Sequence, residues 1–321
     1  MVKIPDPRQR TAAAIYRGYE ENAEDWRRPH LGASVIGDEN CLRHLWYLFR
    51  WAQARNTEGR MLRLFRRGHE EETKVVGDLR RIGVEVLDTD PNTGQQWSVW
   101  LIPGHFGGSC DGKVRGVIEA PKTWHVLEVK GLNDKAFKAL QKAGVREAQP
   151  GHFAQMQTYM HAMKLTRAFY VVVNKNTDHI YTERVNYDRR YAEALIQKAE
   201  RVVFAKEPLE RIKEDPSWFE CKNCDHRDIC HLDRAEQLER NCRTCASSTP
   251  RRDGRWECEL HQKILTNDEQ REGCTSHLFI PSMLPWEWIG YDEDTRSATY
   301  RQKDGATIID QKKELKPWKP E

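Results

Sequence analysis

The chain has 321 residues, 38% of them hydrophobic and 31% charged, and its 52 Lys and Arg against 49 Asp and Glu leave a net charge of only +3. This length predicts one large core with one or two small additional units. The charge balance excludes a uniformly basic nucleic-acid-binding protein. The longest apolar run, residues 168–173, has six residues, whereas a membrane helix needs about 20. The polar start MVKIPDPRQR lacks the apolar stretch of a signal peptide, so we expect a cytoplasmic protein without membrane contact.

Hydrophobic periodicity and turn residues predict the elements in chain order. A polar helix or arm occupies residues 1 to about 30, and helices fill roughly 38–82. Strands follow at about 84–88, 96–102, 105–119 and 124–130. Helices at 133–145 and 151–164 precede strands at 168–174 and 179–186, which a turn at 174–178 joins, and a helix near 188–205. The end of the chain, residues 291–321, is a charged tail whose last part, QKKELKPWKPE, we expect to be poorly ordered.

The helix predicted over residues 61–82 has polar residues where its apolar stripe should continue. The stripe consists of Met61, Phe65, Val75, Val76 and Leu79. His69 and Glu72 fall between its two halves and point the same way, three residues apart. We favour a metal-ligand role for His69, whereas for Glu72 a solvated helix end remains an open alternative. The same helix carries Arg63, Arg66 and Arg67, in a stretch with six arginines and one acid, which favours contacts with DNA.

The segment 111–130 contains Asp111 and then Glu128-x-Lys130 inside an apolar strand. Side chains alternate along a strand, so Glu128 and Lys130 share one face, about 7 Å apart. Two carboxylates hold a hard divalent cation such as Mg²⁺ or Mn²⁺, and an ammonium group steadies the charge that develops in phosphodiester hydrolysis. The alternative is an ordinary Glu–Lys pair on a wet strand face.

Two helices that follow this strand add polar groups. Lys135, Lys138 and Lys142 form a basic stripe opposite Phe137 and Leu140, close after Lys130, so they are candidates for holding phosphates. The alternative for that stripe is a solvated helix face. In GHFAQMQTYMHAM, Gln155 and Tyr159 lie four residues apart beside the core stripe, where they either brace the active site or lie at the core boundary.

Together, His69, Asp111, Glu128-x-Lys130 and Gln155-x3-Tyr159, in that order, resemble the RecB-type branch of the PD-(D/E)xK nucleases. The resemblance covers about residues 30–235. It implies an α/β fold with a restriction-endonuclease-like core, a central mixed sheet flanked by helices. It also implies Mg²⁺ or Mn²⁺ held by His69, Asp111, Glu128 and the carbonyl of Val129, with Lys130 positioning the attacking water and Gln155 and Tyr159 as an accessory pair. Cys110 stands where the family name has a proline, and we interpret it as a small buried residue.

Eight of the nine cysteines fall into two sets, and the first set comprises Cys41 and the C-x2-C-x5-C triplet Cys221, Cys224 and Cys230. Cysteines in an intracellular chain more often bind metal than form disulfides. One distant and three clustered cysteines resemble the iron–sulfur nucleases of the RecB type, among them the CRISPR-associated adaptation nucleases. The resemblance implies a [4Fe–4S] cluster. Since thiolates also suit zinc, a zinc site completed by His226 or His231 is the alternative.

The second set is Cys242, Cys245, Cys258 and Cys274, a spacing that suits a structural Zn²⁺ site. His261 and His277 each follow a cysteine of this set by three residues and are rival ligands. A segment with so little apolar content needs metal to fold. We therefore expect an arm at 1–35, a nuclease domain at 36–235, a zinc module at 240–290 and the tail at 291–321.

We therefore expect a metal-dependent DNA nuclease, and the resemblance implies an exonuclease, similar to phage recombination exonucleases, in a prokaryotic cell or a phage-infected host. Its substrate would be single-stranded DNA or duplex ends, with a recombination or annealing protein as partner. Two alternatives stay open, an endonuclease of the same fold and a catalytically silent DNA-binding or iron–sulfur sensor protein.

Overall fold

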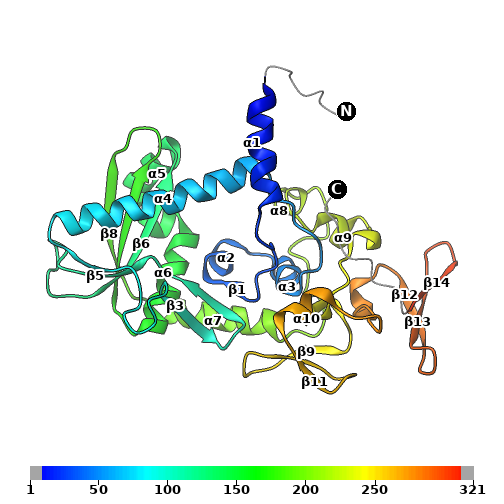
Figure 1. The fold of residues 1–321 in the computed structure, drawn as a ribbon. Coiled ribbons are helices and arrows are strands. Elements are labelled where there is room, and N and C mark those ends of the chain that lie inside the picture. The colour runs from blue at the N-terminus through cyan, green and yellow to red at the C-terminus, as the bar shows by residue number, and fades with distance from the viewer. Residues whose placement is uncertain (1–8, 312–321) are drawn as a thin grey trace. The chain divides into compact units, whose positions relative to one another are not determined.

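The computed structural model describes residues 9–311, which form two compact units (Figure 1). Unit 1 comprises residues 9–26, 55–101 and 107–196, and unit 2 comprises residues 27–54, 102–106 and 197–311. The polypeptide passes from one unit to the other several times. Each unit has its own architecture and its own candidate site.

Unit 1 is built on a five-stranded sheet with the order β2-β5-β6-β7-β8. The strands are β2 (Glu85–Leu87), β5 (Gly112–Arg115), β6 (His125–Leu132), β7 (Arg167–Asn174) and β8 (Ile180–Asn186). The central pair β6 and β7 is parallel and the other pairs are antiparallel. A parallel pair needs a long crossover, which α5 (Asp134–Ala148) and α6 (Pro150–Met163) provide. The predicted mixed sheet flanked by helices is confirmed.

Helix α4 (Gly59–Arg81) lies along one face of this sheet (Figure 1). Its residues Val75, Val76 and Leu79 form one buried cluster with Leu127 and Val129 of β6 and with alternate residues of β7. Glu128 and Lys130 therefore face the opposite side, as the alternation of side chains predicts. Helix α6 covers that side, since its His152 contacts Tyr170, the neighbour of Glu128 in the β6–β7 register.

Four further elements complete the description of unit 1 and its borders. Helix α1 (Arg10–Glu21) packs against α4, and α7 (Arg189–Val203) begins in this unit and continues into unit 2. Strands β3 (Ser98–Ile102) and β4 (Phe106–Ser109) are hydrogen-bonded neighbours. The apolar stripe predicted on α4 is buried only at its C-terminal end, at Val75, Val76 and Leu79. Phe65, nearer the N-terminus of the helix, is 53% exposed.

The single strand predicted over 105–119 is wrong. The chain forms β4 and β5, which belong to different sheets, and it turns between them at Cys110 and Asp111. Gly112 has a φ of +146°, and a Cβ at this position would lie 2.8 Å from the carbonyl oxygen of Leu87. Only glycine tolerates this conformation and this close approach. The turn matters because it carries a candidate metal ligand at its tip.

Unit 2 consists of short elements. Its first part holds β1 (Leu31–Gly32), α2 (Ala33–Asp38) and α3 (Leu42–Arg50), and its second part begins with α8 (Phe219–Lys222) and α9 (Arg227–His231). The 3-10 helices η2 (Ala235–Gln237), η3 (Cys242–Thr244) and η4 (Pro281–Met283) are interspersed with the small sheet β9 (Ser248–Pro250), β10 (Trp256–Cys258) and β11 (Lys263–Leu265) and with α10 (Asn267–Glu272). A further antiparallel sheet joins β12 (Glu287–Asp292), β13 (Ser297–Arg301) and β14 (Thr307–Asp310). Strands β13 and β14 lie inside the segment predicted as a charged tail, so its first part is folded, while residues 312–321 lie outside the described residues.

The core of unit 2 is built around a buried arginine. Arg243 is 1% exposed, and its guanidinium lies 3.7 Å from the ring centroid of Trp51. It donates hydrogen bonds of 2.9 Å to the carbonyl oxygens of Phe49 and Pro29 and to Oε1 of Gln270. A planar group with a fixed fork of donors can satisfy several carbonyls at once, which makes this arginine the link between segments far apart in sequence. None of the helices in the described part of the chain is long and apolar enough to cross a bilayer.

Candidate active site and cysteine cavities

Asp111 lies at the tip of the turn that precedes β5, and its carboxylate is almost completely buried. Strand β5 ends its pairing with β6 at Gly112, opposite Leu127. Beyond that point, Oδ2 of Asp111 accepts a hydrogen bond of 2.7 Å from the backbone N–H of Val129 and so takes the place of a strand partner. The carbonyl of Val129 leaves β6 on the same side as its N–H. The backbone of β6 therefore fixes the carboxylate beside Glu128.

Glu128 is fully buried and forms an ion pair with Lys130 through Oε1. Its other oxygen, Oε2, has no hydrogen-bond partner among the described residues. Burial raises the pKa of Glu128 to about 8, and the charge of Asp111 adds to the effect. A buried carboxylate oxygen without a partner is costly unless a cation binds it. This oxygen fits Mg²⁺ or Mn²⁺, which prefer carboxylate ligands.

Helix α4 brings His69 and Glu72 to the same site. Burial raises the pKa of Glu72 to about 7, the nearby charge of Asp111 raises it further, and Lys130 opposes these effects. Burial also raises the pKa of Asp111, while the charges of Lys130 and His69 lower it. The charges of Glu72, Asp111, Glu128 and Lys130 thus act on one another, and the charge of His69 acts on Asp111.

Gln155 and Tyr159 support the turn that carries Asp111. Nε2 of Gln155 donates to the hydroxyl of Tyr159 at 3.1 Å, and this hydroxyl donates to the carbonyl of Ser109 at 2.7 Å. A Cβ at Gly108 would come within 2.9 Å of the same hydroxyl. Both side chains are buried, and Oε1 of Gln155 has no partner among residues 9–311. Cys110, next to Asp111, is fully buried, as we predicted from its position.

Sequence reasoning missed a pair beside Glu128, in which Tyr170 is buried and His152 is half-buried. The hydroxyl of Tyr170 and Nδ1 of His152 lie 2.6 Å apart. Burial lowers the pKa of His152 to about 3, with a further contribution from Lys130, and burial raises the pKa of Tyr170, with a further contribution from Glu128. Only the parallel register of β6 and β7 places Tyr170 next to Glu128, and a single sequence does not give this register.

The basic residues predicted to bind DNA are exposed on two helices of unit 1, as Lys135, Lys138 and Lys142 on α5 and as Arg63, Arg66 and Arg67 on α4. Some of them have partners. Lys138 pairs with Asp134 at 2.8 Å, and Arg66 pairs with Glu70 at 3.2 Å. Arg67 donates a hydrogen bond of 3.2 Å to the carbonyl of Lys175. Lys175 is therefore a further basic residue next to this group, and the sequence analysis did not name it.

A model of the PD-(D/E)XK nuclease superfamily matches residues 5–231. The chain belongs to this superfamily. Membership accounts for the mixed sheet, and it identifies the protein as a nuclease of a superfamily whose members typically use Mg²⁺ or Mn²⁺. No curated protein matches the chain.

Among solved structures, the nuclease is similar to an alkaline exonuclease, LHK-Exo, from Laribacter hongkongensis. The identity is 17%, the match covers 56% of this chain and 90% of that chain, and the TM-score is 0.40. The complex of LHK-Exo with dAMP matches at 17% identity and a TM-score of 0.39. SSO0001 matches at 13% identity over 68% of this chain and 96% of that chain, with a TM-score of 0.38.

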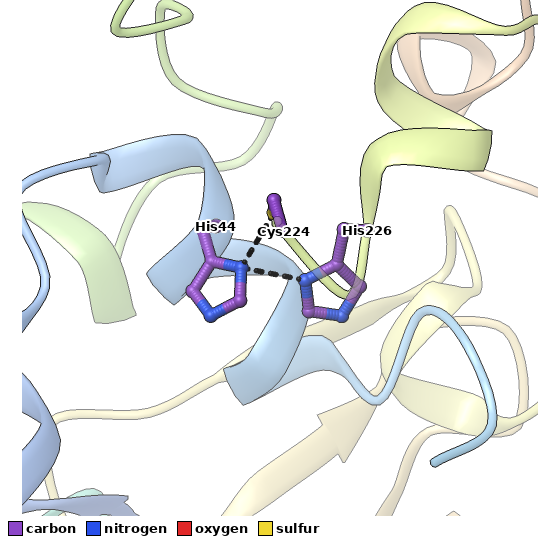
Figure 2. A group of neighbouring side chains, drawn as sticks. All are labelled: His44, Cys224 and His226. Carbon is purple, nitrogen blue, oxygen red and sulfur yellow. Dashed lines mark hydrogen bonds between the residues drawn. The ribbon is translucent and has the colours of Figure 1, made fainter. Parts of the chain in front are cut away.

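In unit 2 of the nuclease, the first cysteine set lines one cavity of about 470 Å³. All four predicted ligands, Cys41, Cys221, Cys224 and Cys230, contribute to its wall. His44 and His226 do so too, and together with Cys224 they form a tight group (Figure 2). Sequence reasoning listed His226 as an alternative ligand and missed His44, whose position three residues after Cys41 on a helix was the available signal.

The second cysteine set lines a separate cavity of about 320 Å³ in unit 2, with Cys242, Cys245, Cys258 and Cys274 in its wall. His261 lies close to this set, since its Nε2 is 3.8 Å from Sγ of Cys274. His277 has partners on both ring nitrogens, Arg240 at 3.1 Å and the hydroxyl of Thr244 at 3.0 Å. These hydrogen bonds favour a structural role for His277 over that of a ligand.

Proposed function

We propose that the nuclease is a DNA exonuclease whose cleavage centre consists of Asp111, Glu128 and Lys130. The observation that carries this proposal is the buried Oε2 of Glu128, which has no partner within residues 9–311 and lies beside the carboxylate of Asp111. Glu128 and Lys130 on β6, with the carboxylate of Asp111 held against β6 by the N–H of Val129, form the set that metal-dependent phosphodiester hydrolysis requires.

His69, Asp111, Glu128 and the carbonyl of Val129 would hold the Mg²⁺ or Mn²⁺ ion. When bound, the ion supplies Lewis-acid activation of water and of the scissile phosphate. The N–H of Val129 holds Asp111 in position. Lys130, fixed by its ion pair with Glu128, orients the attacking water and stabilises negative charge on the phosphate. Glu72 acts as an additional polar group at the edge of the site, and its pKa near 7 suits it to exchange a proton there.

Gln155 and Tyr159 act on this centre through the turn, because their hydrogen bonds end on the carbonyl of Ser109, two residues before Asp111. The exposed Lys135, Lys138 and Lys142 of α5 and Arg63, Arg66 and Arg67 of α4 bind the phosphates of the DNA strand. Exonucleolytic action on single-stranded DNA or duplex ends follows from the resemblance to the RecB type. The same resemblance supports a role in phage or prokaryotic recombination, repair or DNA processing, with an annealing protein as partner.

The two cysteine cavities supply the remaining cofactors of the proposal. Four thiols around one cavity fit a [4Fe–4S] cluster held by Cys41, Cys221, Cys224 and Cys230, which would tie α3 to the segment from α8 to α9. The second cavity, lined by Cys242, Cys245, Cys258 and Cys274, fits Zn²⁺, with His261 as the rival ligand nearest to it.

The test is cleavage by the anaerobically purified full chain on end-labelled linear and on closed circular single-stranded DNA, with Mg²⁺ or Mn²⁺. We expect metal-dependent degradation of the linear substrate alone, and none by Lys130→Ala. Cutting of circles would identify an endonuclease of the same fold. No cleavage of either substrate by a folded, metal-loaded protein would overturn the enzyme proposal in favour of a silent DNA-binding or iron–sulfur sensor protein.

A further inference from the structure

Three side chains of unit 2 converge in a way that the nuclease chemistry does not explain (Figure 2). His44 lies on α3, and Cys224 and His226 lie in the turn between α8 and α9. Nδ1 of His44 is 3.0 Å from Sγ of Cys224 and 3.0 Å from Nδ1 of His226. The three ligand atoms all lie within 4.8 Å of one another, and no other such group of three occurs in residues 9–311.

Hydrogen bonding alone does not satisfy this arrangement. A neutral imidazole nitrogen carries either one hydrogen or one lone pair. Nδ1 of His44 can therefore make one good hydrogen bond, yet two polar atoms lie 3.0 Å from it. A cation placed between the three atoms would accept a lone pair from each of them at once.

The spacing suits a single transition-metal ion. Zinc binds thiolate sulfur at about 2.3 Å and imidazole nitrogen at about 2.0–2.1 Å in tetrahedral geometry, so its ligand atoms lie about 3.3–3.7 Å apart. The two distances of 3.0 Å need only small side-chain movements to reach these values. His226 is 1% exposed and its ring packs on those of His44 and Tyr47, so the group is held in place within the fold.

The carboxylate of Glu39 lies near the ring nitrogen of His44 that does not face Cys224. Nε2 of His44, the nitrogen that faces away from Cys224, lies 3.7 Å from Oε2 of Glu39, within ion-pair distance. The other oxygen of Glu39 accepts a hydrogen bond of 2.7 Å from the backbone N–H of Cys41. Metal-binding histidines commonly direct their second nitrogen at a carboxylate, which fixes the ring and strengthens the ligand.

We propose that His44, Cys224 and His226 bind one Zn²⁺ ion, with water in the fourth position. Mixed thiolate and imidazole ligands suit zinc among the common divalent ions. The site depends neither on the nuclease activity of unit 1 nor on a cluster. Because Cys224 belongs to both ligand sets, this Zn²⁺ site is a property of the chain without the proposed four-cysteine cluster, and the cluster and Zn²⁺ compete for Cys224.

The experiment maps cysteine alkylation by mass spectrometry in the full chain, stripped of metal under reducing anaerobic conditions, with and without ZnCl₂. We expect Zn²⁺ to slow the alkylation of Cys224 and to leave that of Cys41 and Cys221 unchanged, although all three line the same cavity. Equal protection of all the cysteines of the cavity, or no protection of Cys224, would overturn the proposal. This comparison needs no variant, and cleavage of DNA by the same preparation reports the proposed function separately.

Variants then identify the histidines through the Zn²⁺ stoichiometry, measured against a chromophoric chelator. His44→Gln and His226→Gln should each bind one ion fewer per chain than the wild type, while Cys41→Ser should bind the same number. Glu39→Gln should keep the stoichiometry and lower the affinity at this site about tenfold. A stoichiometry that falls with Cys41→Ser and not with His44→Gln in folded proteins would assign the ion to the cysteines alone.

Discussion

Units 1 and 2 place reactive side chains by different means. In unit 1, the ladder of a five-stranded sheet and the aliphatic residues between α4 and the sheet hold the candidate ligands, and a backbone N–H of β6 orients Asp111. In unit 2, short helices and turns carry the cysteines, and a buried arginine links distant segments. Unit 1 can therefore preform its site without metal, whereas we expect the cysteine-rich segments of unit 2 to need metal for their order.

The largest effect should come from replacing Glu128 with glutamine. The variant keeps the shape of the buried side chain and loses the charge that a divalent cation needs, so we expect cleavage of linear DNA to fall on the order of 10²–10³-fold or more. Cleavage rates with saturating Mn²⁺ check this, and circular dichroism checks the fold. A rate within threefold of the wild type would show that Glu128 does not bind the catalytic ion.

Arg243→Lys tests the claim that one buried guanidinium links the segments of unit 2. Lysine cannot reproduce the three hydrogen bonds to Phe49, Pro29 and Gln270, and the loss should lower the free energy of unfolding of this unit by about 3 kcal/mol. Hydrogen exchange in urea, followed on peptides of unit 2, measures it. The matched control is Arg255→Lys, whose exposed and solvent-screened pair with Asp253 should contribute little to the free energy of unfolding. Equal effects of the two substitutions would contradict the assigned role of Arg243.

The raised pKa of Glu128 gives a prediction for the metal-free protein. Between the ordinary pKa of a glutamate and about 8, the metal-free folded protein holds a proton on Glu128 that the unfolded chain has released, so Lys130 then donates its hydrogen bond to a neutral carboxyl group. Stability must then fall as the pH rises from 7 to 8, a window above the ordinary pKa of histidine. Glu72, whose pKa is raised to about 7, also makes the folded protein less stable as the pH rises, mainly near pH 7. Urea unfolding at both pH values should show a smaller decrease for Glu128→Gln than for the wild type, and identical decreases would contradict this account.

Tyr159→Phe should have the smallest effect. It deletes the hydroxyl that donates to Ser109 and accepts from Gln155, at a cost of about 1 kcal/mol, and it loosens the turn before Asp111. We expect cleavage to slow about tenfold at low Mn²⁺ and to recover partly at saturating Mn²⁺, since the defect is one of positioning. Tyr187→Phe is the control, because its hydroxyl contacts His161 in the same unit. If both variants cleave equally well, Tyr159 has no role in positioning Asp111.

The sequence was sufficient for much of unit 1, for a physical reason. The alternation of Val126, Leu127, Glu128, Val129 and Lys130 has a single interpretation on a strand, and the structure places Leu127 and Val129 in the core with α4. The break at Cys110 and Asp111 was missed, although the surrounding Gly107, Gly108, Ser109 and Gly112 are residues typical of turns. The sequence alone does not show that the two halves of this stretch pair in different sheets. Only the register of β6 and β7 shows that Tyr170, and with it His152, lies beside Glu128.

The prediction was less complete for unit 2. The family resemblance grouped Cys41 with the triplet at 221–230, spacing grouped the second set, and each set lines one cavity. Spacing did not reveal His44, which reaches Cys224 only through the approach of α3 to the turn between α8 and α9. It also did not exclude His277, whose nitrogens are occupied by Arg240 and Thr244. Side-chain partners across long separations in sequence depend on packing that periodicity does not encode.

The most direct test of the central claim is the rate of DNA hydrolysis by the full chain as Mn²⁺ is titrated, in the wild type and in Asp111→Asn. The amide oxygen of Asn can still accept the N–H of Val129, so the turn should persist while the metal ligand is lost. We predict a saturable dependence on Mn²⁺ for the wild type and no hydrolysis by Asp111→Asn at any Mn²⁺ concentration. Hydrolysis without divalent metal, or a variant as active as the wild type, would contradict the assignment of Asp111 and Glu128 as the metal-binding centre of this nuclease.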